Sequence, residues 1–271
     1  MFKLINVKPC PNNVGAFIES DILSANKEVI EEMKIALDEY GVIFFQKQKL
    51  DSASYVYFAK QFGTCADYPM LKGLKEFPEI TVVEKKPNEK IMFGEGWHTD
   101  STYTEEPPRF TMLYSIKSPP KGKGNTLFAS QYKSYENLSE KYKKKIENLE
   151  AVFSADGPIS KTRNNRVAEK GKGIDPKTMT ATHSIVKENK RNKKKSIYLS
   201  PGHVTQIINI SEQESKFLLD YLFNHQTKPE FIYGFEWEPN CLAIWSNHTV
   251  LHNPVNDFTG IHRVMHRITI Q

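Results

Sequence analysis

Short apolar runs rich in β-branched and aromatic residues recur along this chain, and they constrain its fold more than any other feature. Helical periodicity occurs in fewer places, at residues 26–40, after Asp51 and after Ser211. The helices therefore do not alternate with strands as they would in a parallel α/β sheet. Many short strands with a few added helices predict a mainly β protein with a β-sandwich or jelly-roll core, and of these we expect the jelly roll, a double-stranded β-helix. The expected strands cover residues 42–45, 80–83, 110–116, 126–129, 230–237, 242–246 and 264–270.

Three polar segments between these runs are predicted to lie at the surface. Residues 132–148 are rich in Lys, Glu and Tyr and are expected to form one exposed helix. Residues 156–177 show little periodicity and are expected to form a long loop, either an active-site lid or a disordered segment. The basic run 187–195 contains no aromatic residue, so a solvated hairpin tip is favoured over a polyanion site. Because no repeat or Gly/Ser linker interrupts the chain, we expect a single domain over residues 1–271.

Composition narrows the class of protein. Apolar residues make up 39% and charged residues 25% of the chain, as in ordinary globular proteins. The net charge is +5, but the basic run 187–195 is not interleaved with aromatic residues as nucleic-acid sites usually are. No stretch of the sequence approaches the ~20 apolar residues of a membrane span. The three cysteines are widely spaced, which indicates a reducing compartment. We expect a cytoplasmic protein that binds neither nucleic acid nor membrane, and the sequence leaves open whether copies form a homo-oligomer.

A candidate metal site begins with His98 and Asp100. Residues two apart on an extended strand project from the same face, so these side chains can share one metal ion. A His-x-Asp pair is weak evidence alone, and the third ligand has to be sought further along, at His248 or His252. Two histidines and a carboxylate on one face of an octahedral metal leave positions open, which suits non-haem Fe(II) oxygenases.

Two arginines follow the histidines, Arg263 and Arg267, and alternation places both on one face of the last strand. The open metal positions suit 2-oxoglutarate, bound as a chelate, and O₂. The remote carboxylate of 2-oxoglutarate needs a cation, and the planar guanidinium fork matches a carboxylate better than lysine does.

The chain resembles the taurine dioxygenase and 2,4-dichlorophenoxyacetate dioxygenase family of Fe(II)/2-oxoglutarate-dependent dioxygenases. The resemblance spans most of the chain, through the motifs GVIFFQKQ, FAKQFG, WHTDSTYTEEPPRFTMLYS, GNTLFAS, LAIWSNHTVLHNPVND and HRVMHRITI. It implies that the iron ligands are His98, Asp100 and His252, because LHNPVND matches the distal-ligand motif. His248 then becomes a strand residue or supports the ligands.

The resemblance also implies roles for other side chains. It assigns 2-oxoglutarate binding to Thr126 and Arg263, and substrate binding to Arg267, Tyr68, Ser101 and His203. The implied reaction consumes 2-oxoglutarate and O₂, releases succinate and CO₂, and hydroxylates a C–H bond. Halogenating relatives lack the carboxylate that Asp100 supplies, which favours hydroxylation.

The substrate is expected to be a small organic anion, a sulfonate, carboxylate or phosphonate, because Arg267 needs an anionic partner. Tyr68 stands where taurine enzymes carry a sulfonate-binding His, and Gly94 where they carry an Asn, so taurine itself is not expected. Two alternatives stay open: a catalytically silent jelly-roll binding protein, and a zinc hydrolase built on the same His/Asp/His set. The zinc hydrolase would have no use for Thr126 and Arg263.

Overall fold

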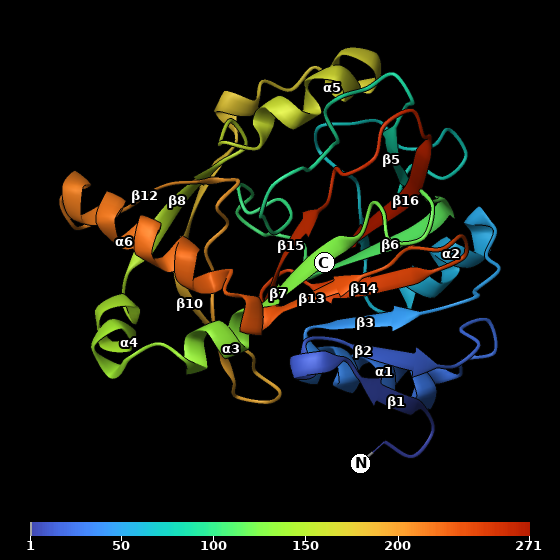
Figure 1. The fold of residues 1–271 in the computed structure, drawn as a ribbon, viewed down its shortest axis with the longest axis horizontal. Coiled ribbons are helices and arrows are strands. Elements are labelled where there is room, and N and C mark those ends of the chain that lie inside the picture. Colours follow the sequence, from blue (N-terminus) through green and yellow to red (C-terminus); the bar gives the residue numbers. More distant parts are fainter. Residues whose placement is uncertain (1) are drawn as a thin grey trace.

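An eight-stranded, mainly antiparallel sheet forms one wall of the protein, whose computed structural model describes residues 2–271 (Figure 1). Its strands follow the order β1-β2-β3-β14-β6-β16-β4, and β5 also pairs with β16. Only β2 and β3 pair in parallel. In chain order the strands are β1 (Asn6–Pro9), β2 (Ala16–Glu19), β3 (Val42–Phe45), β4 (Cys65–Ala66), β5 (Thr81–Lys85), β6 (Phe110–Lys117), β14 (Leu242–Ser246) and β16 (Arg263–Ile270).

A second sheet packs against one face of this wall through an aromatic core. It has the order β13-β7-β15 and is formed by β7 (Thr126–Ser130), β13 (Ile232–Phe235) and β15 (Val250–Pro254). Phe44 of β3 stacks on Phe235 of β13 at 4.2 Å between ring centroids and meets Phe128 of β7 edge-on at 5.5 Å. Alternation explains this contact, because neighbouring side chains on a strand leave opposite faces. Both faces of β3 are buried.

Helices α1 (Lys27–Tyr40) and α2 (Ser52–Lys60) cover the other face of the wall. Ile43 and Phe45 of β3 point toward them. Both helices begin at side-chain caps, and α1 ends at Gly41, whose φ of +76° suits glycine best. The predictions for residues 26–40, 42–45 and the helix after Asp51 are confirmed.

The remaining strands form a smaller layer under helix α6 (Glu212–Gln226). They comprise a three-stranded sheet of β8 (Glu150–Ser154), β9 (Thr180–Ser184) and β12 (Val204–Ile207), and a hairpin of β10 (Val186–Glu188) and β11 (Lys195–Ile197). The Ser211 hydroxyl caps α6 by accepting a hydrogen bond from the Glu214 N–H at 3.2 Å. The hairpin prediction is confirmed, but its tip is not wholly solvated, because Arg191 pairs with Asp38 of α1 at 2.9 Å.

Two predictions about polar segments are wrong. Residues 132–148 form two helices, α3 (Gln131–Glu136) and α4 (Glu140–Ile146), which are separated at Leu138 because this side chain is buried in the core under α6. Residues 156–177 form no plain loop. They contain η2 (Ser160–Arg163), α5 (Asn164–Lys170) and η3 (Pro176–Thr178). Long-range contacts order this segment: the buried Arg166 pairs with Glu89 and Glu169.

The predicted strand at residues 230–237 is shorter than expected. A 3-10 turn, η4 (Pro229–Phe231), precedes β13, and another, η1 (Pro11–Asn13), joins β1 to β2. The mainly β character with added helices is confirmed. Across residues 2–271, every helix is too short or too polar to span a membrane.

Candidate active site

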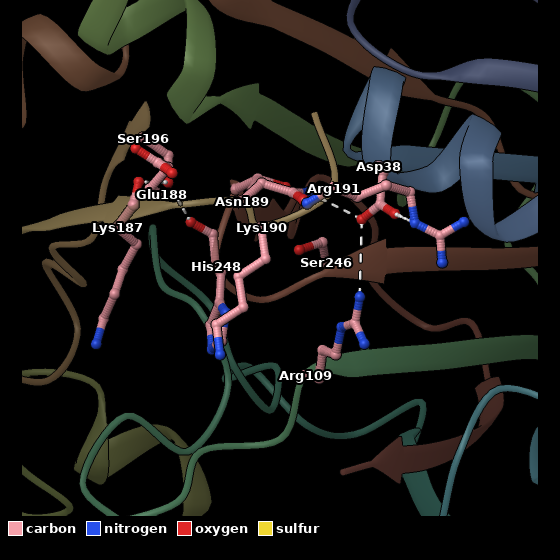
Figure 2. Close-up of a pocket in the computed structure, with 11 residues that line it drawn as sticks. Asp38, Arg109, Lys187, Glu188, Asn189, Lys190, Arg191, Ser196, Ser246 and His248 are labelled. Carbon is pink, nitrogen blue, oxygen red and sulfur yellow. Dashed lines mark hydrogen bonds and ion pairs between the residues drawn. The ribbon is translucent and has the colours of Figure 1, made fainter. Parts of the chain in front are cut away.

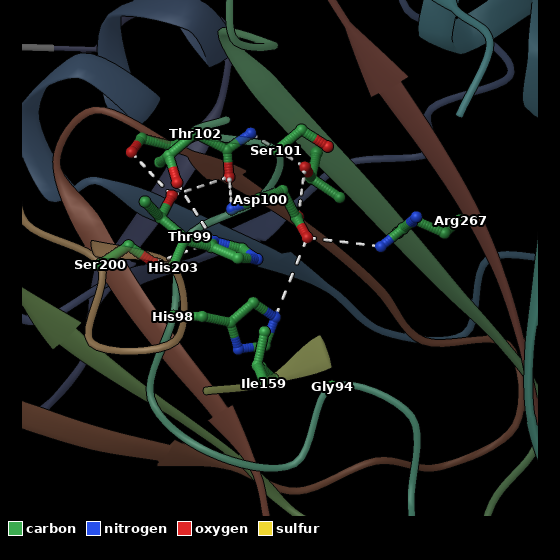
Figure 3. Close-up of polar contacts among 12 residues, drawn as sticks. Gly94, His98, Thr99, Asp100, Ser101, Thr102, Ile159, Ser200, His203 and Arg267 are labelled. Carbon is green, nitrogen blue, oxygen red and sulfur yellow. Dashed lines mark hydrogen bonds and ion pairs between the residues drawn. The ribbon is translucent and has the colours of Figure 1, made fainter. Parts of the chain in front are cut away.

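His98, Asp100 and His252 meet inside the protein, with one candidate ligand atom from each lying within 4.8 Å of the others. The backbone brings the two histidines together: the His98 N–H donates to the His252 carbonyl at 3.0 Å, and the His252 N–H donates back at 2.8 Å. Asp100 lies in a turn two residues later and not on the extended strand that we expected. Its Oδ1 lies 3.9 Å from the His98 Nε2 (Figure 3).

The charge state of these three side chains suits a metal cation. The His98 Nδ1 lies 2.8 Å from the Gly96 carbonyl, and with the proton on Nδ1 the Nε2 lone pair faces Asp100. Burial lowers the pKa of His252 to about 3, so this imidazole is neutral near pH 7. Burial raises the pKa of Asp100, but Arg267 and His252 outweigh it and hold the pKa at about 2. Neutral imidazoles and an ionised carboxylate form a donor set for Fe(II).

Polar neighbours orient the Asp100 carboxylate. The Thr111 hydroxyl donates to Oδ2 at 2.8 Å, and Arg267 Nη1 donates to Oδ1 at 3.3 Å. The Asn247 side chain donates to the Thr111 hydroxyl at 3.0 Å and accepts from Trp245 Nε1 at 3.1 Å. Sequence reasoning missed Asn247, although it stands beside the conspicuous His248.

One cavity beside the triad contains the residues expected to bind 2-oxoglutarate. Thr126 and Arg263 line it together with His252 and apolar side chains. Arg263 is 2% exposed, and its Nε and Nη2 atoms have no hydrogen-bond partner in the described part of the chain. Burial lowers the pKa of Arg263 to about 10, so the guanidinium stays charged at neutral pH. Thr126 Oγ1 accepts from Trp237 Nε1 at 2.9 Å, which leaves its own O–H free to donate.

A second cavity opens on the other side of His98. It contains all the side chains expected on the substrate side, which are Tyr68, Ser101, His203 and Arg267. Gly94, His98 and Arg267 line both cavities. The metal triad therefore lies between two chambers that share a few side chains.

Five further side chains of the second cavity were not predicted: Phe93, Tyr103, Ile159, Thr162 and Arg163. The last three come from the segment that we expected to be a loop, and the 3-10 turn η2 carries two of them. No apolar periodicity marks them. The available signal was the presence of arginines in a chain whose positive charge comes mostly from lysine.

His248 lies outside the metal site. It occupies the turn between β14 and β15 and lines a separate cavity of about 610 Å³. Figure 2 shows its ring beside Lys190, with Lys187 and Arg109 in the same cavity. Burial lowers the pKa of His248 to about 4.

Comparison with known proteins identifies the family of this chain. A family model described as taurine catabolism dioxygenase TauD, TfdA family, matches residues 6–269. The chain belongs to this family. It is therefore a 2-oxoglutarate-dependent non-haem iron dioxygenase that uses Fe(II), 2-oxoglutarate and O₂. This result sets aside the zinc hydrolase and the silent binding protein.

Individual members of the TauD/TfdA family are similar over most of this chain. An α-ketoglutarate-dependent sulfonate dioxygenase of Saccharomyces cerevisiae is 28% identical over 266 residues, which cover 93% of this chain and 62% of that protein. An α-ketoglutarate-dependent sulfate ester dioxygenase of Pseudomonas putida is 27% identical and covers 98% of this chain and 89% of its own length. A solved taurine dioxygenase from Burkholderia xenovorans superposes with a TM-score of 0.83 at 26% identity, covering 99% of this chain and 89% of that one.

Proposed function

We propose that this TauD/TfdA-family enzyme hydroxylates a C–H bond of a small organic anion, a sulfonate, carboxylate or phosphonate, and releases succinate and CO₂ from 2-oxoglutarate and O₂. One observation carries the proposal. The triad lies between two cavities: the unpartnered Arg263 lines only the cavity that contains Thr126, and Arg267 lies where the two cavities meet. Each cavity thus offers a cation for one of the two anions that the reaction needs.

In this proposal the metal ligands are His98, Asp100 and His252. Backbone pairing brings the two histidines together, and the Thr111 hydroxyl orients Asp100. Iron with 2-oxoglutarate and O₂ supplies the oxidant for the C–H bond. The chain contributes orientation and the exclusion of water.

The cosubstrate side rests on Arg263 and Thr126. A buried guanidinium without a partner is costly, and a carboxylate accepting from Nε and Nη2 would remove that cost. The Thr126 hydroxyl can donate to the same carboxylate. Arg263 therefore binds the remote carboxylate of 2-oxoglutarate. The rest of the molecule lies in the cavity that Arg263 and His252 both line.

The prime substrate is proposed to bind through Arg267, whose Nε and Nη2 are also buried without a hydrogen-bond partner in the described residues. The Arg267 guanidinium lies over the Tyr68 ring, at 4.1 Å from its centroid. Ser101 and His203 border the same space. Taurine is not the expected substrate, because Tyr68 adds no positive charge and Gly94 offers no polar partner for an amine.

Two structural proposals accompany the function. The wall formed by the large sheet and the smaller β13-β7-β15 sheet would constitute a double-stranded β-helix, a jelly-roll core with the triad at its open end. Residues 1–271 would fold as one domain. Both are supported by the shared aromatic core between the two sheets.

The test has two steps. Anaerobic addition of Fe(II) and 2-oxoglutarate should produce the weak visible charge-transfer band of the iron chelate, which zinc cannot produce. Succinate release should then depend on one member of a panel of alkylsulfonates, aryloxyacetates and phosphonates, measured beside taurine. A missing band, or a neutral or cationic compound as the best substrate, would contradict the proposal. Taurine as the best substrate by kcat/KM would contradict the expected departure from taurine.

A further inference from the structure

The substrate cavity contains a second buried arginine, Arg163, which the family resemblance did not assign. It projects from η2 and is 4% exposed, and its Nη2 donates to the Ala155 carbonyl. The Arg163 guanidinium lies 5.7 Å from the ring centroid of Tyr103. Arg163 and Arg267 line the same cavity from different elements, η2 and β16.

Positive charge in this cavity exceeds negative charge. Asp100 is the only carboxylate among the residues that line it, against two guanidinium groups. Asp100 is also a proposed metal ligand, so a divalent cation would compete with Arg267 for its charge. Both arginines lie close to the Tyr68 phenol. Burial raises the pKa of Tyr68, but Arg163 and Arg267 outweigh this effect and hold the pKa below its usual value.

Asp100 balances only one of the two buried guanidinium groups, and a metal ion at the triad would share that charge, which indicates a ligand that brings more than one negative charge. Building on the proposed function, we propose that Arg163 and Arg267 together bind the head group of the prime substrate. This head group is a tetrahedral dianion, a phosphonate or a phosphate monoester. Sulfonates and carboxylates carry one charge and would leave one guanidinium uncompensated. A tetrahedral head also offers three acceptor oxygens, enough for two guanidinium forks.

The position of η2 explains how such a substrate would reach the triad. The cavity measures about 20 Å³, room for roughly one water molecule. A substrate needs more room than this, and a displacement of segment 159–163, which lines the cavity, would provide that room and then bring Arg163 back onto the head group. Closure would then depend on the charge of the substrate, since Arg163 is the charged side chain that this segment brings to the cavity.

The experiment measures binding without turnover, on protein loaded with Mn(II) and the unreactive 2-oxoglutarate analogue N-oxalylglycine. Calorimetry compares compounds that share a carbon chain: propylphosphonate, propyl phosphate and propylsulfonate, hexylphosphonate and hexylsulfonate, and phenylphosphonate and benzenesulfonate. The dianionic compounds should bind about tenfold or more tightly than the sulfonate of the same chain, since one additional charge-assisted contact is gained. Comparison of propyl phosphate with propylphosphonate identifies which dianion source the site prefers.

Variants separate the role of Arg163 from general charge. Arg163→Met should reduce the preference for the dianion by about tenfold, while Arg163→Lys should keep part of it. Lys161→Met removes the same charge from the same turn but at an exposed position, so it should leave the preference unchanged. N-oxalylglycine binding by each variant shows that the fold and the metal site are intact.

Acidification provides an independent readout, because the second ionisation of a phosphate monoester has a pKa of about 6. The preference for propyl phosphate over propylsulfonate should fall as the pH drops through that value. The inference is overturned if sulfonates bind as tightly as dianions, if Arg163→Met weakens both classes equally, or if loaded protein binds no dianion. Failure to bind Mn(II) and N-oxalylglycine would instead refute the proposed function itself.

Discussion

Single residues set the chemistry of this site mainly through buried nitrogen atoms that lack hydrogen-bond partners among the described residues. Arg263 and Arg267 have buried nitrogen atoms without hydrogen-bond partners among the described residues, and His252 Nδ1 is in the same condition. Buried polar atoms in folded proteins are normally satisfied. Other unpartnered buried atoms lie elsewhere in the fold, but the nitrogen atoms of His252, Arg263 and Arg267 border the triad and its two cavities, where a metal ion, 2-oxoglutarate and a substrate would complete them.

At this scale the first prediction concerns the metal ligands. Replacing His98, Asp100 or His252 by Ala removes one of three donors, so each variant should lose substrate-dependent succinate formation and bind iron weakly. His248→Ala is the matched control, because that ring lies in a different cavity. Iron content after anaerobic loading measures the effect. Loss of iron from His248→Ala, with retention by His252→Ala, would reverse the assignment of the distal ligand.

The second prediction separates the two arginines of β16. Arg263→Ala should raise the KM for 2-oxoglutarate roughly ten- to a hundredfold, since a charge-assisted hydrogen bond contributes ~1.5–3 kcal/mol. Arg267→Ala should leave that KM nearly unchanged but release succinate without matching product, because the substrate is no longer held at the triad. Steady-state kinetics with product and succinate counted together tests this division. Equal effects on 2-oxoglutarate binding would disprove it.

At the level of elements, the site depends on close approaches between segments that are distant in sequence. Gly202, in the turn before β12, donates its N–H to the Trp97 carbonyl and accepts from the Ile159 N–H. It thereby connects the segment carrying His98 to the segment carrying η2. A Cβ at this glycine would lie 3.0 Å from His98 Cβ and 3.1 Å from Ile159 Cβ.

The third prediction follows from that geometry. Gly202→Ala should lower the free energy of unfolding by ~1–3 kcal/mol, as overpacking usually does, and should weaken metal binding because His98 must shift. Gly234→Ala in β13 is the control, since its nearest neighbour is the flexible end of Leu127 at 3.3 Å. Urea unfolding and a metal titration measure the two effects. Wild-type metal affinity in Gly202→Ala would show that this contact does not position His98.

At the scale of the whole molecule, ligand binding should add to stability, because the triad draws on segments far apart in the sequence and forms only in the folded chain. The fourth prediction is that Mn(II) with N-oxalylglycine at about 100 times Kd stabilises the fold by ~2.7 kcal/mol. For a chain of this size that corresponds to a rise in Tm of roughly 5–10 °C. Calorimetry should show the rise in the native protein and none in His252→Ala. An equal rise in this variant would place the ligands elsewhere.

Residue order alone predicts the features that depend on local patterns. Short apolar runs predicted β3, β14 and β16 closely, and alternation correctly placed Arg263 and Arg267 on one buried face. Caps predicted the starts of α2 and α6 and the end of α1. The order of motifs indicated the family and the three candidate ligands. These features follow from period and hydrogen bonding between near neighbours, which the chain carries in its residue order.

Contacts between segments that are distant in sequence appear only in the folded protein. Residues 156–177 contain no apolar period, and their helices are held by contacts such as the pair of Arg166 with Glu89, formed across 77 positions. The turn at Asp100, the support from Asn247 and the approach of Arg163 to the substrate cavity arise in the same way. Their physical cause is packing and charge pairing between distant parts of the chain. These features could not be predicted because a local sequence pattern does not identify which distant residue will be the partner.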